Sequence, residues 1–340
     1  MAVADQIASS PEVPPASERG VNYSTRVDKI SPRARVVRGV QIVLSLLLAV
    51  VMLIPVFWMG TTAFKGRADA IAVPPKVFFT PTLEGFVNLL TDRSVLNRAR
   101  IRRMEARIDE LTWYEKIALA GGQQITGMSA NASRLLNSVI IAGTSTILAV
   151  VLGLLAAYAF SRFKVPGEAD WLFFILSTRM LPPVVVTIPI FLMYRELGLH
   201  DTHLGLILLY TVFNLSLTVW LLKGFMDEIP REYEDAAMVD GYTRLQAFRK
   251  VVLPQAVTGI AATTVFSLIF AWNEYAFALM LTSDNARTAP PTIPTILGRG
   301  GMEWGAIAAG SLGFLIPVVI VTFVLRKHLL RGVTFGAIRQ

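Results

Sequence analysis

The chain has no cysteine among its 340 residues, and only 16% of its residues are charged. Without cysteine it can form no disulfide framework, no thiolate metal site and no cysteine nucleophile. Its three histidines are too loosely spaced along the chain for a metal site. Soluble domains usually carry about 25% charged residues, so the deficit argues against a soluble enzyme.

A phosphate-binding loop is also missing, because the pattern G-x-x-x-x-G-K-[ST] occurs nowhere in the sequence. The chain therefore supplies no ATP chemistry of its own. We expect no catalytic residue and no cofactor bound by this chain.

Long apolar runs are abundant, and hydrophobic residues make up 54% of the chain. A membrane-spanning helix needs roughly 20 mostly apolar residues. Six such runs occur, and they are too long and too uniformly apolar for barrel strands. We predict an all-α membrane protein with six transmembrane helices at residues 40–63, 135–160, 171–193, 204–222, 257–281 and 305–325.

The basic residues predict the orientation of these spans. Residues 1–38 are polar, rich in Pro and Ser and without an apolar signal segment, so we expect a disordered tail before a first transmembrane helix at 39–63. If this tail is cytoplasmic, the cytoplasmic segments hold 17 Lys and Arg, against 3 in the short loops opposite. Both termini, including a tail at 326–340, are therefore predicted to be cytoplasmic. This distribution also disfavours nucleic-acid binding as the reason for the net charge of +8.

A long loop at residues 64–134 carries 11 further Lys and Arg. Long loops cross the membrane largely regardless of charge, so we expect this loop to be extracytoplasmic. Within it, residues 94–120 have the pattern of an amphipathic helix or helix pair. The insertion is interpreted either as a solvated charged helix, which the composition favours, or as a docking platform for an extracytoplasmic partner.

The region of the last five predicted spans, residues 135–325, contains a polar segment at residues 227–256. Pro230 and the acidic residues after it are typical of a helix start, and Gly241 is typical of a helix stop. Thr243 and Gln246 have the spacing of a capping box for a second helix. Pro254 is predicted to bend the chain into the next span.

On the first of these helices, Tyr233, Ala236, Ala237 and Asp240 have the spacing of one helix face. Two alanines beside an aromatic ring would form a shallow surface that another protein can approach closely. A charged loop is usually only solvated, so the face by itself does not establish a partner.

The order of residues in the segment 227–256 resembles the EAA loop of ABC importer permeases, most closely those of maltose-type carbohydrate importers. We therefore call residues 227–256 the coupling segment and residues 135–325 the core permease region. The match runs through Asp235-Ala236-Ala237, Gly241 and Val251 to Pro254. Asp235 stands where this family usually has Glu, and Val251 where it usually has Ile. The C-terminal stretch from Gly332 to Ile338 also resembles the family's tail, with Phe335 in place of a small residue.

This resemblance implies the type I importer permease fold in the cytoplasmic membrane. It implies a subunit that moves a sugar, polyol or related solute by alternating access, together with a second, usually different, permease subunit, two ATPase subunits that bind ATP and Mg, and an extracytoplasmic solute-binding protein. It also implies ATPase coupling through Tyr233, Asp235, Ala236, Ala237, Asp240, Gly241, Val251, Leu253 and Pro254, and tail contacts through Gly332, Thr334 and Gly336.

Polar residues inside spans are costly and mark candidates for the translocation path, namely Arg179, Asn214, Asn273 and Glu274. Glu274 either lines a polar path or pairs with a neighbouring helix. Arg179 precedes a helix-breaking Pro-Pro pair, and it either caps the freed carbonyls, which we favour, or faces a cavity. An ion-coupled secondary transporter or channel remains the alternative function, although no inverted repeat is visible.

Overall fold

The computed structural model describes residues 32–298 and 301–335, with side chains from Val36 to Lys327. The chain divides into two compact units, residues 1–54 and 55–340. The described part of the first unit is the beginning of helix α1, Pro32–Ala63. The helix begins at Pro32, before the predicted boundary at residue 38, because proline is accepted in the first helical turn.

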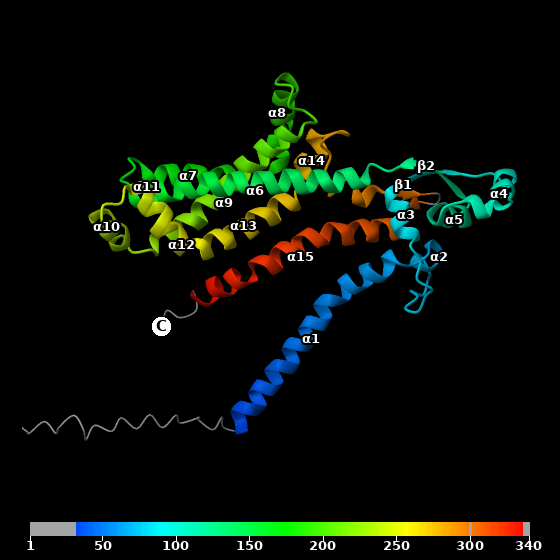
Figure 1. Cartoon of the computed structure of the whole chain (residues 1–340), viewed down its shortest axis with the longest axis horizontal. Coiled ribbons are helices and arrows are strands. Elements are labelled where there is room, and N and C mark those ends of the chain that lie inside the picture. The colour runs from blue at the N-terminus through cyan, green and yellow to red at the C-terminus, as the bar shows by residue number, and fades with distance from the viewer. Residues whose placement is uncertain (1–31, 299–300, 336–340) are drawn as a thin grey trace, which may run out of the picture. The chain divides into compact units, whose positions relative to one another are not determined.

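The second unit is largely helical (Figure 1). Its α-helices after α1 are α2 Arg67–Ala70, α3 Glu84–Leu90, α4 Arg98–Glu105, α5 Trp113–Ala120, α6 Asn131–Arg162, α7 Glu168–Ser177, α8 Pro183–Glu196, α9 His203–Asp227, α10 Glu232–Val239, α11 Arg244–Ala247, α12 Leu253–Gln255, α13 Val257–Trp272, α14 Ala276–Leu281 and α15 Trp304–Phe335. Short 3₁₀ turns occur at Ile108–Glu110, Thr178–Met180 and Ile293–Thr295, and a π-turn at Phe248–Val252.

Among the described residues, four helices are long and apolar enough to cross a membrane, and they lie in α1, α6, α9 and α15. The number of spans rises to six if each of two bent helix pairs is counted as one span. The predicted third span is not one straight helix. Its helices α7 and α8 meet at 92°, because Pro182 and Pro183 interrupt the hydrogen-bond ladder. The predicted fifth span is likewise divided, since α13 ends at Trp272 and α14 begins at Ala276.

The core of the second unit forms where α6, α9 and α13 pack together (Figure 1). Close approach of α6 and α9 depends on Gly153, where an added Cβ would lie 2.4 Å from the Thr218 side chain. Small residues permit such contact between membrane helices, which have no hydrophobic driving force between them in lipid. Two of the buried clusters lie along these helices, one near the coupling segment and one towards the other end of the helices.

Two small antiparallel ladders depart from the all-helical expectation. Strand β1, Thr91–Val95, pairs with β2, Gln123–Met128, and a two-residue pair, Leu297–Gly298 with Gly301–Met302, forms the second ladder. The first ladder carries the predicted helix pair, observed as α4 and α5, at its end. We call residues 91–128 the hairpin insertion.

Candidate functional site

The coupling segment is built on the short helix α10, Glu232–Val239, which begins after Pro230 rather than at it. Acidic residues fill its first turn, as the helix dipole favours. Gly241 ends it with a φ of +89°. The N–H of Gly241 donates to the Met238 carbonyl at 3.1 Å and that of Tyr242 to the Ala237 carbonyl at 3.0 Å, which is a Schellman motif. The predicted glycine stop is confirmed.

The second helix of the coupling segment has the predicted capping box. The Thr243 N–H donates to Gln246 Oε1 at 2.8 Å, and the Gln246 N–H donates to Thr243 Oγ1 at 3.4 Å. The chain then passes through the π-turn and Pro254 and bends by 73° into α13. The segment is therefore an elbow of two capped helices leading into the next apolar helix.

The sequence reasoning missed the residue that fastens this elbow, Glu234. Its side chain is buried, and it forms an ion pair with the guanidinium of Arg162 at the end of α6. The Tyr158 hydroxyl donates to its other carboxylate oxygen at 2.9 Å. Arg162 also donates to the Ile229 carbonyl at 2.9 Å, so both buried charges are hydrogen-bonded as burial demands. Glu234 shares a helix face with Ala237, but the sequence does not distinguish it from the other acidic residues of α10.

Apolar packing supports the same junction. Phe248 and Val252 of the elbow are buried against Leu222 and Met226 of α9. The rings of Tyr158 and Phe248 lie 4.5 Å apart between centroids. The elbow is thus held to the ends of α6 and α9 by both charge and packing.

The outer face of α10 is open, but it differs from the predicted face. Tyr233, Ala236 and Asp240 are exposed, and Tyr233 keeps 53% of its surface accessible. Ala237 was predicted to share this face, yet it is buried because it turns inward with Glu234. Asp235 and Pro254 are exposed, whereas Val251 and Leu253 are half-buried.

Three of the four predicted path residues meet at one cavity of about 230 Å³, namely Arg179, Asn214 and Glu274. Asn273 is outside its lining, and its amide instead donates to the Ile269 carbonyl of its own helix at 2.8 Å. The lining of this cavity combines these polar groups with the apolar side chains of Leu181, Pro183, Phe213, Phe270 and Phe277.

The two ionisable residues of this cavity have contacts that the sequence did not indicate. Arg179 donates to the Phe213 carbonyl of α9 at 3.2 Å and lies 4.1 Å from the Phe270 ring centre, so it does not cap the carbonyls freed by its own proline break. Glu274 accepts the Phe277 N–H at 2.6 Å and thereby caps α14. Among the described residues it forms no ion pair with a neighbouring helix.

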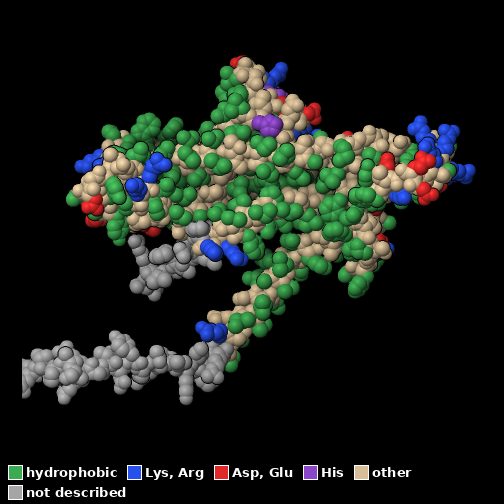
Figure 2. Space-filling view, viewed as in Figure 1, with side chains coloured by type: hydrophobic (Ala, Val, Ile, Leu, Met, Phe, Trp, Pro, Cys, Tyr) green, Lys and Arg blue, Asp and Glu red, His purple; other side chains and the backbone are tan. Residues whose placement is uncertain are grey.

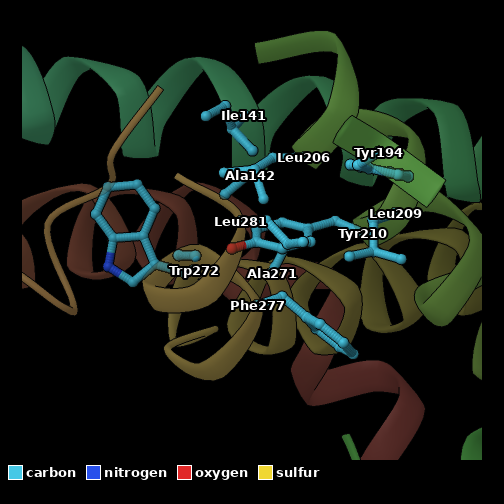
Figure 3. Close-up of a cluster of buried hydrophobic side chains, with 11 residues drawn as sticks. Ile141, Ala142, Tyr194, Leu206, Leu209, Tyr210, Ala271, Trp272, Phe277 and Leu281 are labelled. Atoms are coloured by element: carbon cyan, nitrogen blue, oxygen red, sulfur yellow. The ribbon is translucent and has the colours of Figure 1, made fainter. Parts of the chain in front are cut away.

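Tyr210 is a further residue of this cavity that sequence reasoning missed. It is 3% exposed and lies in the buried cluster with Ala271 and Phe277 (Figure 3). Its hydroxyl has no hydrogen-bond partner among the described residues. A buried hydroxyl without a partner is costly, so its position beside a polar cavity suits a ligand or water that enters there.

The predicted tail contacts lie at the end of α15. Gly332 and Thr334 belong to that helix, which extends to Phe335, so the predicted tail at 326–340 is helical at its start. Gly336 lies outside the described residues.

Comparison with known proteins identifies relatives of this chain. Residues 149–335 match the family described as binding-protein-dependent transport system inner membrane component. The trehalose transport system permease protein SugB of Mycobacterium tuberculosis is 39% identical over 211 residues, which cover 61% of this chain and 77% of the relative. The trehalose/maltose transport system permease protein MalG of Thermococcus litoralis is 28% identical over 297 residues, covering 87% of this chain and 94% of the relative.

Among solved structures, a chain of a bacterial ABC transporter involved in the import of the acidic polysaccharide alginate has the same fold. The TM-score is 0.62 at 20% sequence identity, and the match covers 88% of this chain and 98% of that chain. The predicted importer permease fold is therefore confirmed.

Proposed function

This chain belongs to the family of binding-protein-dependent transport system inner membrane components and is a permease subunit of an ABC importer in the inner membrane; we propose that its solute is a sugar, polyol or related carbohydrate. Support for the solute class comes from the relatives, of which one is named for trehalose and another for trehalose and maltose. We further propose a complex with a second permease subunit of different sequence, two ATPase subunits that bind ATP and Mg, and an extracytoplasmic solute-binding protein.

The observation that carries the coupling role is the elbow with one face fastened and the other face open. A lever must transmit motion without bending, and the buried pair of Glu234 and Arg162 ties α10 to α6. A partner must also reach it, and Tyr233, Ala236 and Asp240 present a shallow exposed surface. In the proposed mechanism, a cleft of the ATPase holds this surface, and closure of the ATPase dimer moves α6 and α9 through it.

The predicted orientation enters this proposal, with the elbow in the cytoplasm and the hairpin insertion outside. The tail residues Gly332, Thr334 and Gly336 are proposed to contact the same ATPase.

The cavity beside Arg179, Asn214 and Glu274 is proposed as part of the translocation path. Its polar groups can exchange hydrogen bonds with solute hydroxyls, while Phe270 and Phe277 supply apolar contact. Tyr210→Phe tests this role, because it removes an unpartnered hydroxyl and should leave the stability of the protein unchanged. Uptake with altered KM at wild-type stability would support the path, and unchanged uptake would contradict it.

Reconstitution in liposomes tests the function as a whole. We expect uptake only when ATP is enclosed with the ATPase and when the solute-binding protein is present outside. The alternative, an ion-coupled transporter, predicts proton- or sodium-driven uptake by this chain alone. Ligand screening of the purified solute-binding protein then identifies the solute, and a ligand other than a carbohydrate or polyol would overturn the solute class.

A further inference from the structure

The hairpin insertion presents an arginine cluster that the proposed transport mechanism does not use. Five arginines occur within ten residues, Arg98 to Arg107, against one acidic residue, Glu105. None of the residues of α4 is buried, and the cluster forms a blue patch at the end of the molecule that α4 occupies (Figure 2). Of these five arginines, only Arg107 has a carboxylate partner among the described residues, and this partner is Glu110.

Two of these arginines, Arg98 and Arg100, do not stabilise their own helix, whereas Arg102 and Arg103 lie in its last turn, where the helix dipole favours cations. Arg98 and Arg100 occupy the first turn of α4, which contains no acidic residue. The positive end of the helix dipole lies there, so cations in this turn are unfavourable. Their presence outside the membrane also runs against the positive-inside distribution of the other loops. The helix dipole therefore does not explain Arg98 and Arg100, and it does not require a cluster of five arginines.

A groove lies beside the cluster, with a volume of about 420 Å³. Arg100, Arg103 and Arg107 line it together with the apolar side chains of Met104 and Leu111. Its two carboxylates are already engaged, since Glu110 pairs with Arg107 and Glu115 accepts hydrogen bonds from Thr112. Arg100 and Arg103 are thus the uncompensated charges of the groove.

Lipid headgroups are a poor match for this surface. Figure 1 shows α4 and α5 beyond the beginning of α6, carried away from it by the β1 and β2 strands. The five paired residues of this ladder span about 16 Å at about 3.3 Å per residue. The headgroup layer on each side of a bilayer is only roughly 5 to 8 Å thick. Because the ladder is longer than this layer is thick, we expect α4 to stand in the aqueous space.

The composition of the surface favours a protein over an acidic polysaccharide. Next to α4, helix α5 exposes Trp113 and Tyr114, whose ring centres lie 5.5 Å apart. Exposed aromatic rings and arginines are both enriched in protein interfaces and in their energetic hot spots. The apolar floor of the groove would find no counterpart in a uniformly polar, acidic glycan.

We propose that the arginine face of α4 and the groove beside it form a docking surface for an acidic segment of the extracytoplasmic solute-binding protein. This inference rests on the proposed function, because it requires such a protein outside the membrane. The charges would speed and orient the encounter, and Trp113 would supply the apolar contact.

The test uses the complete transporter in nanodiscs of neutral phosphatidylcholine, with its purified solute-binding protein as the probe. Arg100→Gln with Arg103→Gln should raise the Kd at least tenfold in 50 mM salt and leave basal ATP hydrolysis unchanged. The matched control, Arg100→Lys with Arg103→Lys, keeps the charges and should change the Kd by less than threefold. The difference between the two should shrink in 500 mM salt.

Equal Kd values for the wild type and the glutamine pair would overturn the proposal while leaving the importer function intact. Normal receptor binding with selective loss of acidic polysaccharide uptake would also overturn it, in favour of a glycan site. Trp113→Ala provides an independent variant of the same surface, expected to raise the Kd at both salt concentrations. Failure of the proposed function gives a different result from failure of this docking proposal. In that case the wild-type complex would bind no solute-binding protein or contain no ATPase.

Discussion

The coupling segment and the hairpin insertion both contain short helices and both lie between long helices. They are attached to the rest of the protein in opposite ways. The coupling segment is fastened to α6 and α9 by the buried pair of Glu234 and Arg162 and by an apolar cluster. The hairpin insertion is carried by a two-stranded ladder, and its helix α4 buries no residue. In the coupling segment the key charge points inward, whereas in the insertion the charges point outward.

The two proposed roles give a reason for this difference. A segment that transmits force must not shift relative to the helices that it moves, so its buried carboxylate forms an internal ion pair with one of them. A segment that meets a soluble partner must leave its charges free. Each region also contains one capping box, Thr243 with Gln246 and Thr112 with Glu115, which permits matched experiments.

Removing the internal charge pair should have the largest effect. Glu234→Ala leaves Arg162 buried without its partner, and we expect a loss of about 3 to 5 kcal/mol in the free energy of unfolding. Thermal unfolding of the purified complex measures the loss of stability. Copurification of the ATPase measures whether the complex still assembles. Glu232→Ala, on the exposed side of the same helix, is the matched control, and equal losses for both variants would contradict the fastening role.

The glycine stop of the coupling segment comes next. Gly241→Ala forces a side chain into a left-handed conformation, at a cost of about 1 to 2 kcal/mol. An added Cβ would meet nothing within 4 Å, so the effect is conformational rather than steric. ATP-driven uptake should fall. Gly241→Asn should lose less, because asparagine tolerates this conformation; equal uptake by all three proteins would break the lever interpretation.

The two capping boxes give the sharpest comparison of the regions. Thr112→Ala and Thr243→Ala should each cost about 1 kcal/mol of local helix stability. Only Thr243→Ala should reduce ATP hydrolysis coupled to uptake, while Thr112→Ala should loosen α5 alone. Hydrogen exchange locates the loosening in each variant. Loss of ATPase copurification in Thr112→Ala would show that the insertion is not independent of the elbow.

The smallest expected effect is a pH dependence of one capping box and not of the other. Hydrogen bonds from the Thr112 hydroxyl and backbone N–H lower the pKa of Glu115. The stabilisation is therefore complete above the unfolded pKa of Glu, about 4.3, and is lost as the pH falls through the lower folded pKa. Gln246 does not titrate. Amide protection factors in the first helical turn should fall more in α5 than in α11 between pH 6 and pH 3, and equal changes would contradict this assignment.

Local patterns predicted much of the fold and of the elbow. Gly241 and the pair of Thr243 and Gln246 are capping signals that act within a few residues, so they could be read from the sequence. The strands of the hairpin insertion escaped prediction because short polar strands carry little periodic signal. Glu234 escaped because three neighbouring acids in α10 look alike until Arg162, 72 residues earlier, selects one of them.

The sequence by itself determined the six apolar runs, their punctuation by proline and glycine, and the capped elbow, because hydrophobicity and backbone preference are properties of neighbouring residues. Tertiary structure alone decided that Ala237 faces inward, that Arg179 reaches a carbonyl of α9, and that Tyr210 and Glu274 share a cavity. Those outcomes depend on how helices distant in the chain pack together, and pairing between distant residues leaves no mark on a single sequence.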